Sequence, residues 1–167
     1  MKYSIQVMNG HDWEVVKNIY LQGINTNKAT FQPNLPSWKQ WDEGHLQECR
    51  FVIRADDNIV GWSALGAVSG RECYRGVVEV SIYIAEEARG LGLGEILLNH
   101  TIKASEQAGF WSLYSAVLAE NIGSIALHKK CGFRQIGVRE KLAKMESTGK
   151  WHDVVLFERR SKSIGIN

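Results

Sequence analysis

Hydrophobic and polar residues along the chain follow two periods, one typical of strands and one typical of helices. Alternation with a period of two predicts strands at residues 3–7, 51–55, 59–65, 76–84, 111–118, 133–144 and 151–159. A period near 3.6 predicts one helix after Asp12, one opening at Ser37, a long one ending near Gln107 and one over 121–131. No single β–α unit repeats, so this order predicts a mixed sheet and not a purely parallel one.

Polar residues at helix starts support these boundaries. Asp12 is expected to cap the first helix, and Ser37 with Gln40 forms a capping-box pattern at the start of the second. No proline- or glycine-rich linker divides the chain. The predicted fold is therefore one α/β domain over residues 1–167, an α+β mixed sheet with helices on both faces.

The composition of the 167 residues is that of an ordinary globular protein, with 44% hydrophobic and 23% charged residues. The net charge of +2 gives no broad cationic field, so nucleic acid is not expected as a partner. No apolar stretch is long enough to span a membrane, and the N-terminus lacks an apolar signal core. We therefore expect no membrane partner and a cytoplasmic location.

The three cysteines are too few and too widely spaced for a metal or disulfide framework. Cys49, Cys73 and Cys131 form no CxxC pair and stand in no Cys/His ligand spacing. Reduced thiols and no metal are expected. An acetyl carrier role for Cys73 or Cys131 would need a nearby base, and none is evident.

A glycine-rich segment between a predicted strand and a predicted helix is the clearest chemical signal. It reads Arg89-Gly90-Leu91-Gly92-Leu93-Gly94. Glycines allow backbone N–H groups to converge and a phosphate to approach, and the helix that follows adds its positive end. The register fits neither GxGxxG nor a P-loop. The segment therefore predicts a pyrophosphate site, the alternative being a tight turn without a ligand.

The pattern Arg89-x-x-Gly92-x-Gly94 resembles the pyrophosphate loop of the GCN5-related N-acetyltransferase (GNAT) superfamily. A second segment, with Asn121, Ser124, His128, Gly132 and Phe133, is similar to the same superfamily. The stretches 74–84 and 149–154 and the loop 25–31 resemble its phosphinothricin/methionine sulfoximine acetyltransferase branch. The resemblance covers nearly the whole chain and implies the GNAT fold, in which a central mixed sheet binds acetyl-CoA.

This resemblance also implies which residues contact the cosubstrate. The backbone of Ile82, Tyr83 and Ile84 is expected to hold the pantetheine arm beside two strands that splay apart. The remaining contacts are expected from Arg89, Gly90, Leu91, Gly92, Leu93, Gly94, Glu95, Asn121, Ser124 and Lys130. A backbone N–H near the thioester would stabilise the oxyanion.

Glu79 is the residue that we expect to act as a base. It lies mid-strand between Val78 and Val80, where a carboxylate is costly to bury unless it has a partner or a task. Burial would raise its pKa towards values that suit proton abstraction. The alternative is a structural ion pair with a nearby Arg or Lys. The resemblance implies the catalytic role.

Two histidines have open assignments. His128 stands where many GNAT relatives have a tyrosine that protonates the departing thiolate, and the alternative is a histidine on a helix surface without a catalytic role. His152 is expected to line the acceptor pocket or, equally well, to hydrogen-bond to its neighbour Asp153.

The acceptor side is expected from the segment before the Glu79 strand. Arg75 is a natural partner for a carboxylate or phosphinate, and its alternative is a solvent-exposed loop arginine. The resemblance places substrate contacts at Glu72, Cys73, Tyr74 and Arg75, with Phe31 closing the pocket from the opposite loop.

The sequence therefore predicts an acetyl-CoA-dependent N-acetyltransferase that transfers acetyl directly to the α-amine of a small amino-acid analogue. The alternatives are a protein N-terminal, lysine or polyamine acetyltransferase, and a non-catalytic acyl-CoA-binding module. A retained Glu79 argues against the non-catalytic module, because binding alone needs no base. Relatives commonly pair, so a homodimer is expected.

Overall fold

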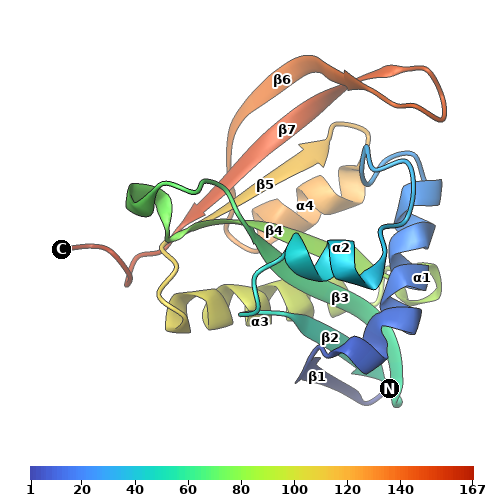
Figure 1. Cartoon of the computed structure of the whole chain (residues 1–167), viewed down its shortest axis with the longest axis horizontal. Helices are drawn as coiled ribbons and strands as arrows, with labels where there is room; N and C mark the ends of the chain where they lie inside the picture. The colour runs from blue at the N-terminus through green and yellow to red at the C-terminus, as the bar shows by residue number, and fades with distance from the viewer.

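The computed structural model describes all 167 residues, which form seven strands and four helices joined by short turns (Figure 1). The predicted order of elements is confirmed. The elements are β1 (Tyr3–Val7), α1 (Trp13–Asn25), α2 (Trp38–Glu43), β2 (Phe51–Ala55), β3 (Asn58–Ala67), β4 (Val77–Ile84), α3 (Leu93–Gln107), β5 (Ser112–Leu118), α4 (Ile122–Lys130), β6 (Arg134–Lys144) and β7 (Trp151–Arg160). Three 3-10 turns, Gly10–Asp12, Glu72–Tyr74 and Glu86–Ala88, lie between them.

All seven strands belong to one sheet in the order β1-β2-β3-β4-β5-β7-β6. The pair β4–β5 is parallel, whereas every other neighbouring pair is antiparallel. Strands β2, β3 and β4 form the meander, and β6 and β7 form a long hairpin that projects from the far end of the sheet (Figure 1). The predicted mixed sheet is therefore confirmed.

Helices cover both faces of this sheet, as alternation along the central strands requires. On one face the hydroxyl of Ser63 in β3 lies 2.7 Å from the hydroxyl of Thr101 in α3. On the other face the preceding residue, Trp62, packs edge-on against Tyr20 of α1 with ring centroids 5.6 Å apart. Helices α3 and α4 thus cover one face, and α1 with α2 covers the other.

Strands β4 and β5 separate part-way along their length, and this separation positions the site. They pair over only three positions, Val77 with Ser112, Val78 with Leu113 and Glu79 with Tyr114. Beyond Glu79 the two strands diverge, although β4 continues to Ile84. Alternate backbone groups of this part of β4 therefore face a gap instead of a neighbouring strand.

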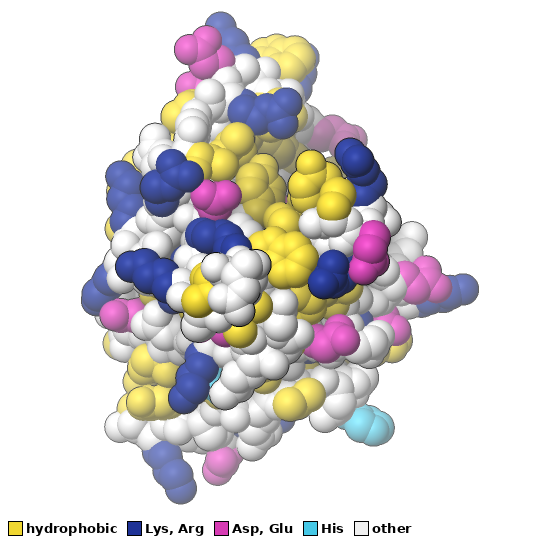
Figure 2. Space-filling model, turned by 90° about the vertical axis from the view of Figure 1, so that its left-hand side faces the viewer, with side chains coloured by type: hydrophobic (Ala, Val, Ile, Leu, Met, Phe, Trp, Pro, Cys, Tyr) yellow, Lys and Arg dark blue, Asp and Glu magenta, His cyan; other side chains and the backbone are white.

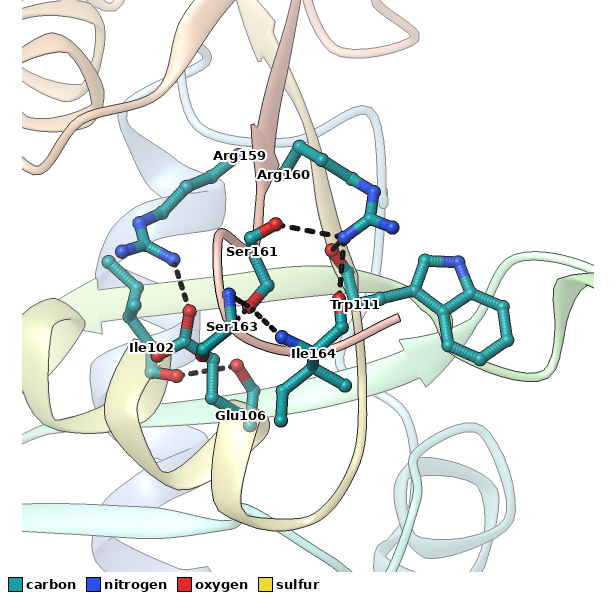
Figure 3. A network of polar contacts seen from close by, with 9 residues as sticks. Ile102, Glu106, Trp111, Arg159, Arg160, Ser161, Ser163 and Ile164 are labelled. Carbon is teal, nitrogen blue, oxygen red and sulfur yellow. Dashed lines mark hydrogen bonds and ion pairs between the residues drawn. The ribbon is translucent and has the colours of Figure 1, made fainter. Parts of the chain in front are cut away.

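A polar network fixes the closed end of the β4–β5 pair (Figure 3). Arg160, at the end of β7, donates to the carbonyl of Trp111 at 3.1 Å and to that of Ile164 at 2.8 Å. Arg159 donates to Glu106 of α3 at 3.1 Å, and hydrogen bonding from Ser161 together with this arginine lowers the pKa of Glu106. Because Trp111 directly precedes β5, these bonds tie β5 and β7 to α3 at this end.

The helix caps agree with the sequence at one site and differ at the other. Ser37 and Gln40 form the predicted capping box. The cap expected from Asp12 is wrong, because Asn9 caps the 3-10 turn that precedes α1. The carboxylate of Asp12 instead accepts the backbone N–H of Asn9 at 3.0 Å and pairs with Arg54 at 3.2 Å.

The three cysteines are free, with Cys131 buried and Cys73 exposed. No three His, Cys, Asp or Glu side chains cluster in a way that could hold a metal ion. No helix combines the length and the apolar character needed to cross a membrane.

Candidate active site

A cavity of about 1150 Å³ occupies the gap between β4 and β5. Its walls are residues 79–84 of β4 and 115–118 of β5, together with the loop after α1, the start of α3 and one side of α4. The unpaired edge of β4 faces this space, so an extended ligand can bind there as an added strand would.

The glycine-rich segment forms one end of this cavity. Gly90 and Gly92 have φ values of +76° and +80°, a conformation that favours glycine, and no heavy atom lies within 4 Å of a Cβ built on either residue. None of the N–H groups from Gly90 to Glu95 donates in a turn or loop backbone hydrogen bond. Since these groups precede or open helix α3, they form an anion site that fits a pyrophosphate.

Most of the residues expected around this loop line the cavity: Ile82, Tyr83, Ile84, Arg89, Gly90, Gly92, Leu93, Gly94, Glu95, Asn121, Ser124 and Lys130. Leu91 is the exception, because its side chain is exposed and lies outside the cavity. Asn121 caps α4 by accepting the N–H of Ser124 at 3.2 Å. Lys130 pairs with Glu95 at 2.6 Å, and this hydrogen bond raises the pKa of Lys130.

Glu79 lies at the point where β4 and β5 part, and its side chain lines the cavity. It has no ion-pair or hydrogen-bond partner, so the alternative of a structural ion pair is not supported. The expected burial is wrong in degree, because the carboxylate is exposed to the water of the cavity. The surrounding protein nevertheless desolvates it enough to raise its pKa, which suits a proton acceptor.

His128 is buried, with 2% of its surface exposed, so the alternative of a surface histidine is wrong. Its ring stacks on Phe157 at a centroid distance of 5.3 Å, and its Nδ1 lies 2.7 Å from the carbonyl oxygen of Ser124. A carbonyl can only accept, so Nδ1 carries the proton and Nε2 keeps a lone pair. Nε2 has no partner in the protein, and burial lowers the pKa of this histidine.

The site thus has three features: a loop that fits pyrophosphate, a gap beside the open edge of β4, and the carboxylate of Glu79 at one end of this gap. The comparison with known families agrees with them. Residues 13–133 match the model described as the acetyltransferase (GNAT) family. The chain belongs to the GNAT acetyltransferase family. It is therefore an N-acetyltransferase of the acyltransferase class.

Two curated relatives and one solved structure show what this GNAT chain is similar to. It is 29% identical over 167 residues to phosphinothricin N-acetyltransferase of Alcaligenes faecalis, covering 93% of this chain and 81% of that protein. It is 25% identical to the L-methionine sulfoximine/L-methionine sulfone acetyltransferase of Pseudomonas paraeruginosa, covering 95% and 94%. A GNAT phosphinothricin acetyltransferase from Sinorhizobium meliloti, solved with AcCoA, shares the fold with a TM-score of 0.84 at 23% identity, covering 99% and 97%.

The acceptor end of this GNAT cavity is more aromatic than the sequence suggested. Phe31 lines it as expected, and Tyr20, Trp62 and Tyr83 line it as well. The Trp62 and Tyr83 rings stack with centroids 4.9 Å apart, because the two residues are directly opposite on β3 and β4. Aromatic residues at strand and helix spacing are equally typical of core packing, so only the strand register places these rings in the site.

Other residues of the acceptor end were missed altogether. Lys28, Thr30 and His45 line the cavity, although the sequence assigned no role to these three side chains. Gly23 lies beneath them, and a Cβ at this position would be 2.6 Å from the ring of Tyr83. A glycine inside a helical pattern indicates close packing against a neighbouring element, and Gly23 is such a signal in the sequence.

Glu72, Cys73, Tyr74 and Arg75, which precede β4, do not line this cavity, and their expected contacts with the substrate stay a prediction. Glu72 to Tyr74 form an exposed 3-10 turn. Arg75 pairs with Glu72 at 3.5 Å and lies over the ring of Trp111 at 5.3 Å. The reason is direction along the strand, because β4 opens onto the cavity only from Glu79 onwards, whereas this segment precedes the closed end.

His152 is buried but does not line the cavity. Its ring meets the ring of Phe31 edge-on, with the ring centroids 6.1 Å apart. Its Nδ1 is 3.0 Å from the carboxylate of Glu120, and this contact lowers the pKa of Glu120. The alternative bond to Asp153 is also wrong, because that carboxylate accepts the N–H of Lys141 at 2.8 Å.

Proposed function

We propose that this enzyme transfers the acetyl group of acetyl-CoA directly to the α-amine of a small amino-acid analogue of the phosphinothricin or methionine sulfoximine type. The observation that carries this proposal is the single cavity that joins the glycine loop, the open edge of β4 and Glu79. The names of the curated relatives support the same substrate class.

Different residues along the cavity bind different parts of acetyl-CoA. The N–H groups of residues 90–95 hold the pyrophosphate, and the open edge of β4 from Val80 to Ile84 holds the pantetheine arm. An N–H of this edge also donates to the thioester oxygen, where negative charge develops during attack. The thioester carbon is thereby placed next to Glu79.

Glu79 accepts a proton from the acceptor's ammonium group, which frees the nitrogen lone pair. The nitrogen then attacks the thioester carbon, so that a C–N bond forms and the C–S bond breaks. The nitrogen loses a second proton, the thiolate takes up one proton, and the products are the amide and CoA thiol. The raised pKa of Glu79 supports this role, because it brings the carboxyl closer to the pKa of the proton that it must accept.

Lys28 is the residue that we assign to the acceptor's carboxylate. The cations that line the cavity are Lys28, Arg89 and Lys130. Arg89 belongs to the pyrophosphate loop, where its Nε donates to the carbonyl of Ile84 at 3.1 Å, and Lys130 is paired with Glu95. Lys28 is in no ion pair and lies in the same loop as Phe31, at the acceptor end.

We also infer that the chain pairs with a second copy through β6. This strand is the outer edge of the sheet, and its apolar residues Ile136 and Val138 are 43% and 48% exposed. Figure 2 views the molecule from the side of the C-terminus and shows hydrophobic side chains gathered among Lys and Arg side chains on its upper part. Light scattering should give a dimer mass for the wild type and a monomer mass for Val138→Lys.

A thiol-release assay with acetyl-CoA tests the proposed reaction across a panel of amines. Phosphinothricin, methionine sulfoximine and methionine sulfone should release CoA. A polyamine, a peptide with a free N-terminus and a peptide with a lysine side chain should not. Release with a peptide or the polyamine alone would favour the alternative acceptors. Binding of acetyl-CoA without release for any amine would favour a non-catalytic module.

A further inference from the structure

The loop that follows α2, residues 44–50, covers the acceptor end of the cavity. The N–H of Leu46 donates to the carbonyl of Leu65 in β3 at 2.8 Å. A Cβ on Gly66 would lie 3.6 Å from the carbonyl oxygen of Gly44. Gly66 is directly opposite Glu79 on the neighbouring strand, so this loop lies over the part of the sheet that presents the base.

The buried side chain of Arg50 holds the loop 44–50 in one conformation. Arg50 is only 5% exposed, and its guanidinium donates to the carbonyls of Leu46 at 2.6 Å, Asp42 at 2.8 Å and His45 at 3.0 Å. It also pairs with the carboxylate of Asp42 and lies over the ring of Trp41 at 5.2 Å. Since all of these partners are within nine residues of one another, the loop around His45 is preorganised.

His45 lines the cavity, and one of its ring nitrogens has no hydrogen-bond partner in the protein. Its ring stacks on Trp41 with a centroid distance of 4.2 Å and meets Trp62 edge-on at 6.3 Å. Its Nδ1 lies 2.7 Å from the carbonyl oxygen of Trp41, so the proton is held on Nδ1 and Nε2 keeps a lone pair. No protein donor reaches Nε2, which is open to water, and burial of the ring lowers the pKa of His45.

We propose that His45 is a specificity-determining residue, whose Nε2 accepts a hydrogen bond from an N–H or O–H at the end of the acceptor's side chain. This inference rests on the proposed function, in which Glu79 binds the reacting amine. The aromatic wall of Tyr20, Trp62 and Tyr83 packs against the part of the side chain between the two polar ends. The preferred acceptor is therefore an amino acid whose side chain ends in a hydrogen-bond donor.

Three acceptors of similar size distinguish this proposal from simple shape selection. Methionine sulfoximine ends in an S=NH group that can donate to Nε2. Methionine sulfone has an oxygen in place of that group and can only accept. Phosphinothricin ends in an anionic phosphinate, which would meet the lone pair of a neutral imidazole. Sites built around one hydrogen bond reject the analogue that lacks it more strongly than apolar pockets reject a missing methylene.

The experiment measures kcat/KM for sulfoximine and sulfone with wild type, His45→Phe and His45→Gln. Wild type should prefer the sulfoximine by about 10-fold or more, as expected for one polar contact. His45→Phe keeps an aromatic ring over Trp41 but has no acceptor, so the preference should fall to within about 2-fold through a higher KM for the sulfoximine. His45→Gln, whose amide oxygen can accept, should retain part of the preference. The KM for acetyl-CoA should not change in either variant.

His100→Phe is the matched control, because this exposed histidine of α3 packs on Phe51 outside the cavity and should leave the ratio unchanged. Equal use of sulfoximine and sulfone by the wild type would overturn the proposal about His45 while leaving the proposed reaction intact. An unchanged ratio in folded His45→Phe would do the same. If no amino-acid analogue releases CoA from the wild type, the proposed function itself fails.

Discussion

Glu79 and His128 line the same cavity from opposite faces of the sheet. Glu79 is paired with Tyr114 and belongs to the face that α1 and α2 cover, whereas His128 stacks on Phe157 on the face that α3 and α4 cover. The two side chains share one space because β4 and β5 part beyond Glu79. A reaction in this gap can therefore exchange protons with one residue on each side of the sheet.

The first prediction concerns His128, whose Nε2 is unprotonated in the free enzyme. His128→Phe should lower kcat by only about 3- to 10-fold, because an imidazole whose Nε2 has no proton cannot protonate the CoA thiolate, which is already a good leaving group. Burial lowers the pKa of His128, so the wild-type kcat should not fall between pH 7 and pH 9 through loss of its proton. A wild-type decline over that range that is absent in His128→Phe would show that a protonated His128 takes part.

Glu79→Gln keeps the size of the side chain but removes the basic oxygen. We expect kcat to fall by about 10²- to 10⁴-fold with nearly unchanged acetyl-CoA binding, the usual range for loss of a positioned base. Because the pKa of Glu79 is raised, wild-type activity should decline as the pH falls through that raised value. The variant's defect should shrink as the pH rises and free amine accumulates. Activity within about threefold of wild type at pH 7 would remove Glu79 from the mechanism.

The same substitution should stabilise the fold near neutral pH. Folding raises the pKa of Glu79, so the folded state favours its protonated form. The contribution of the Glu79 side chain to the free energy of unfolding is fully present below its unfolded-state pKa. This contribution is lost as the pH rises through its folded-state pKa. Glu79→Gln should therefore have a higher Tm than wild type at pH 8 and an equal Tm at pH 4, measured by calorimetry. Glu87→Gln is the control, because Glu87 is exposed in the 3-10 turn before α3 and lies outside the cavity, so this variant should match wild type at both pH values.

Gly92→Val tests the pyrophosphate loop, and Gly109→Val is its matched control. Both glycines have positive φ and open space at the Cβ position, so each substitution should cost about 1–2 kcal/mol of stability through backbone strain. Only Gly92 lines the cavity, where the new side chain would occupy the space of the pyrophosphate. Calorimetric titration should show weak CoA binding for Gly92→Val and normal binding for Gly109→Val. Equal affinities would contradict the loop assignment.

Lys28→Met and Arg75→Met separate the two candidate carboxylate partners. Lys28 lines the cavity, so its loss should raise the acceptor's KM by about 5- to 20-fold, a modest effect because the ammonium is exposed to solvent. Arg75 lies over Trp111 outside the cavity, so its loss should leave both KM values within about 2-fold. An acceptor with an amidated carboxylate should be insensitive to Lys28→Met. The reverse order of effects would return Arg75 to the site.

Local patterns in the sequence predicted the elements and the glycine-rich loop, whereas the other expected cosubstrate contacts came from the resemblance to the GNAT superfamily. Alternation in 76–84 predicted β4, and the spacing of Arg89, Gly92 and Gly94 defined the anion loop before any contact was known. The acceptor half depends on tertiary register. Nothing local to His45 indicates that a hydrogen bond from Leu46 to β3 places it over the base, and nothing near Arg75 shows that Trp111 holds it away.

The separation of β4 from β5 also has a mechanical consequence. Strands β1 to β4 lie on one side of this separation, and β5, β7 and β6 lie on the other. The two parts of the sheet pair at only three positions, from Val77 to Glu79. The network of Arg159 and Arg160 stiffens the join at its closed end. If the two parts of the sheet bent about these three pairs, the opposite end of the cavity would widen or narrow while every strand pairing stayed intact. Glu79 is the last paired residue of β4, so this bending would displace its carboxylate less than any group farther along the cavity.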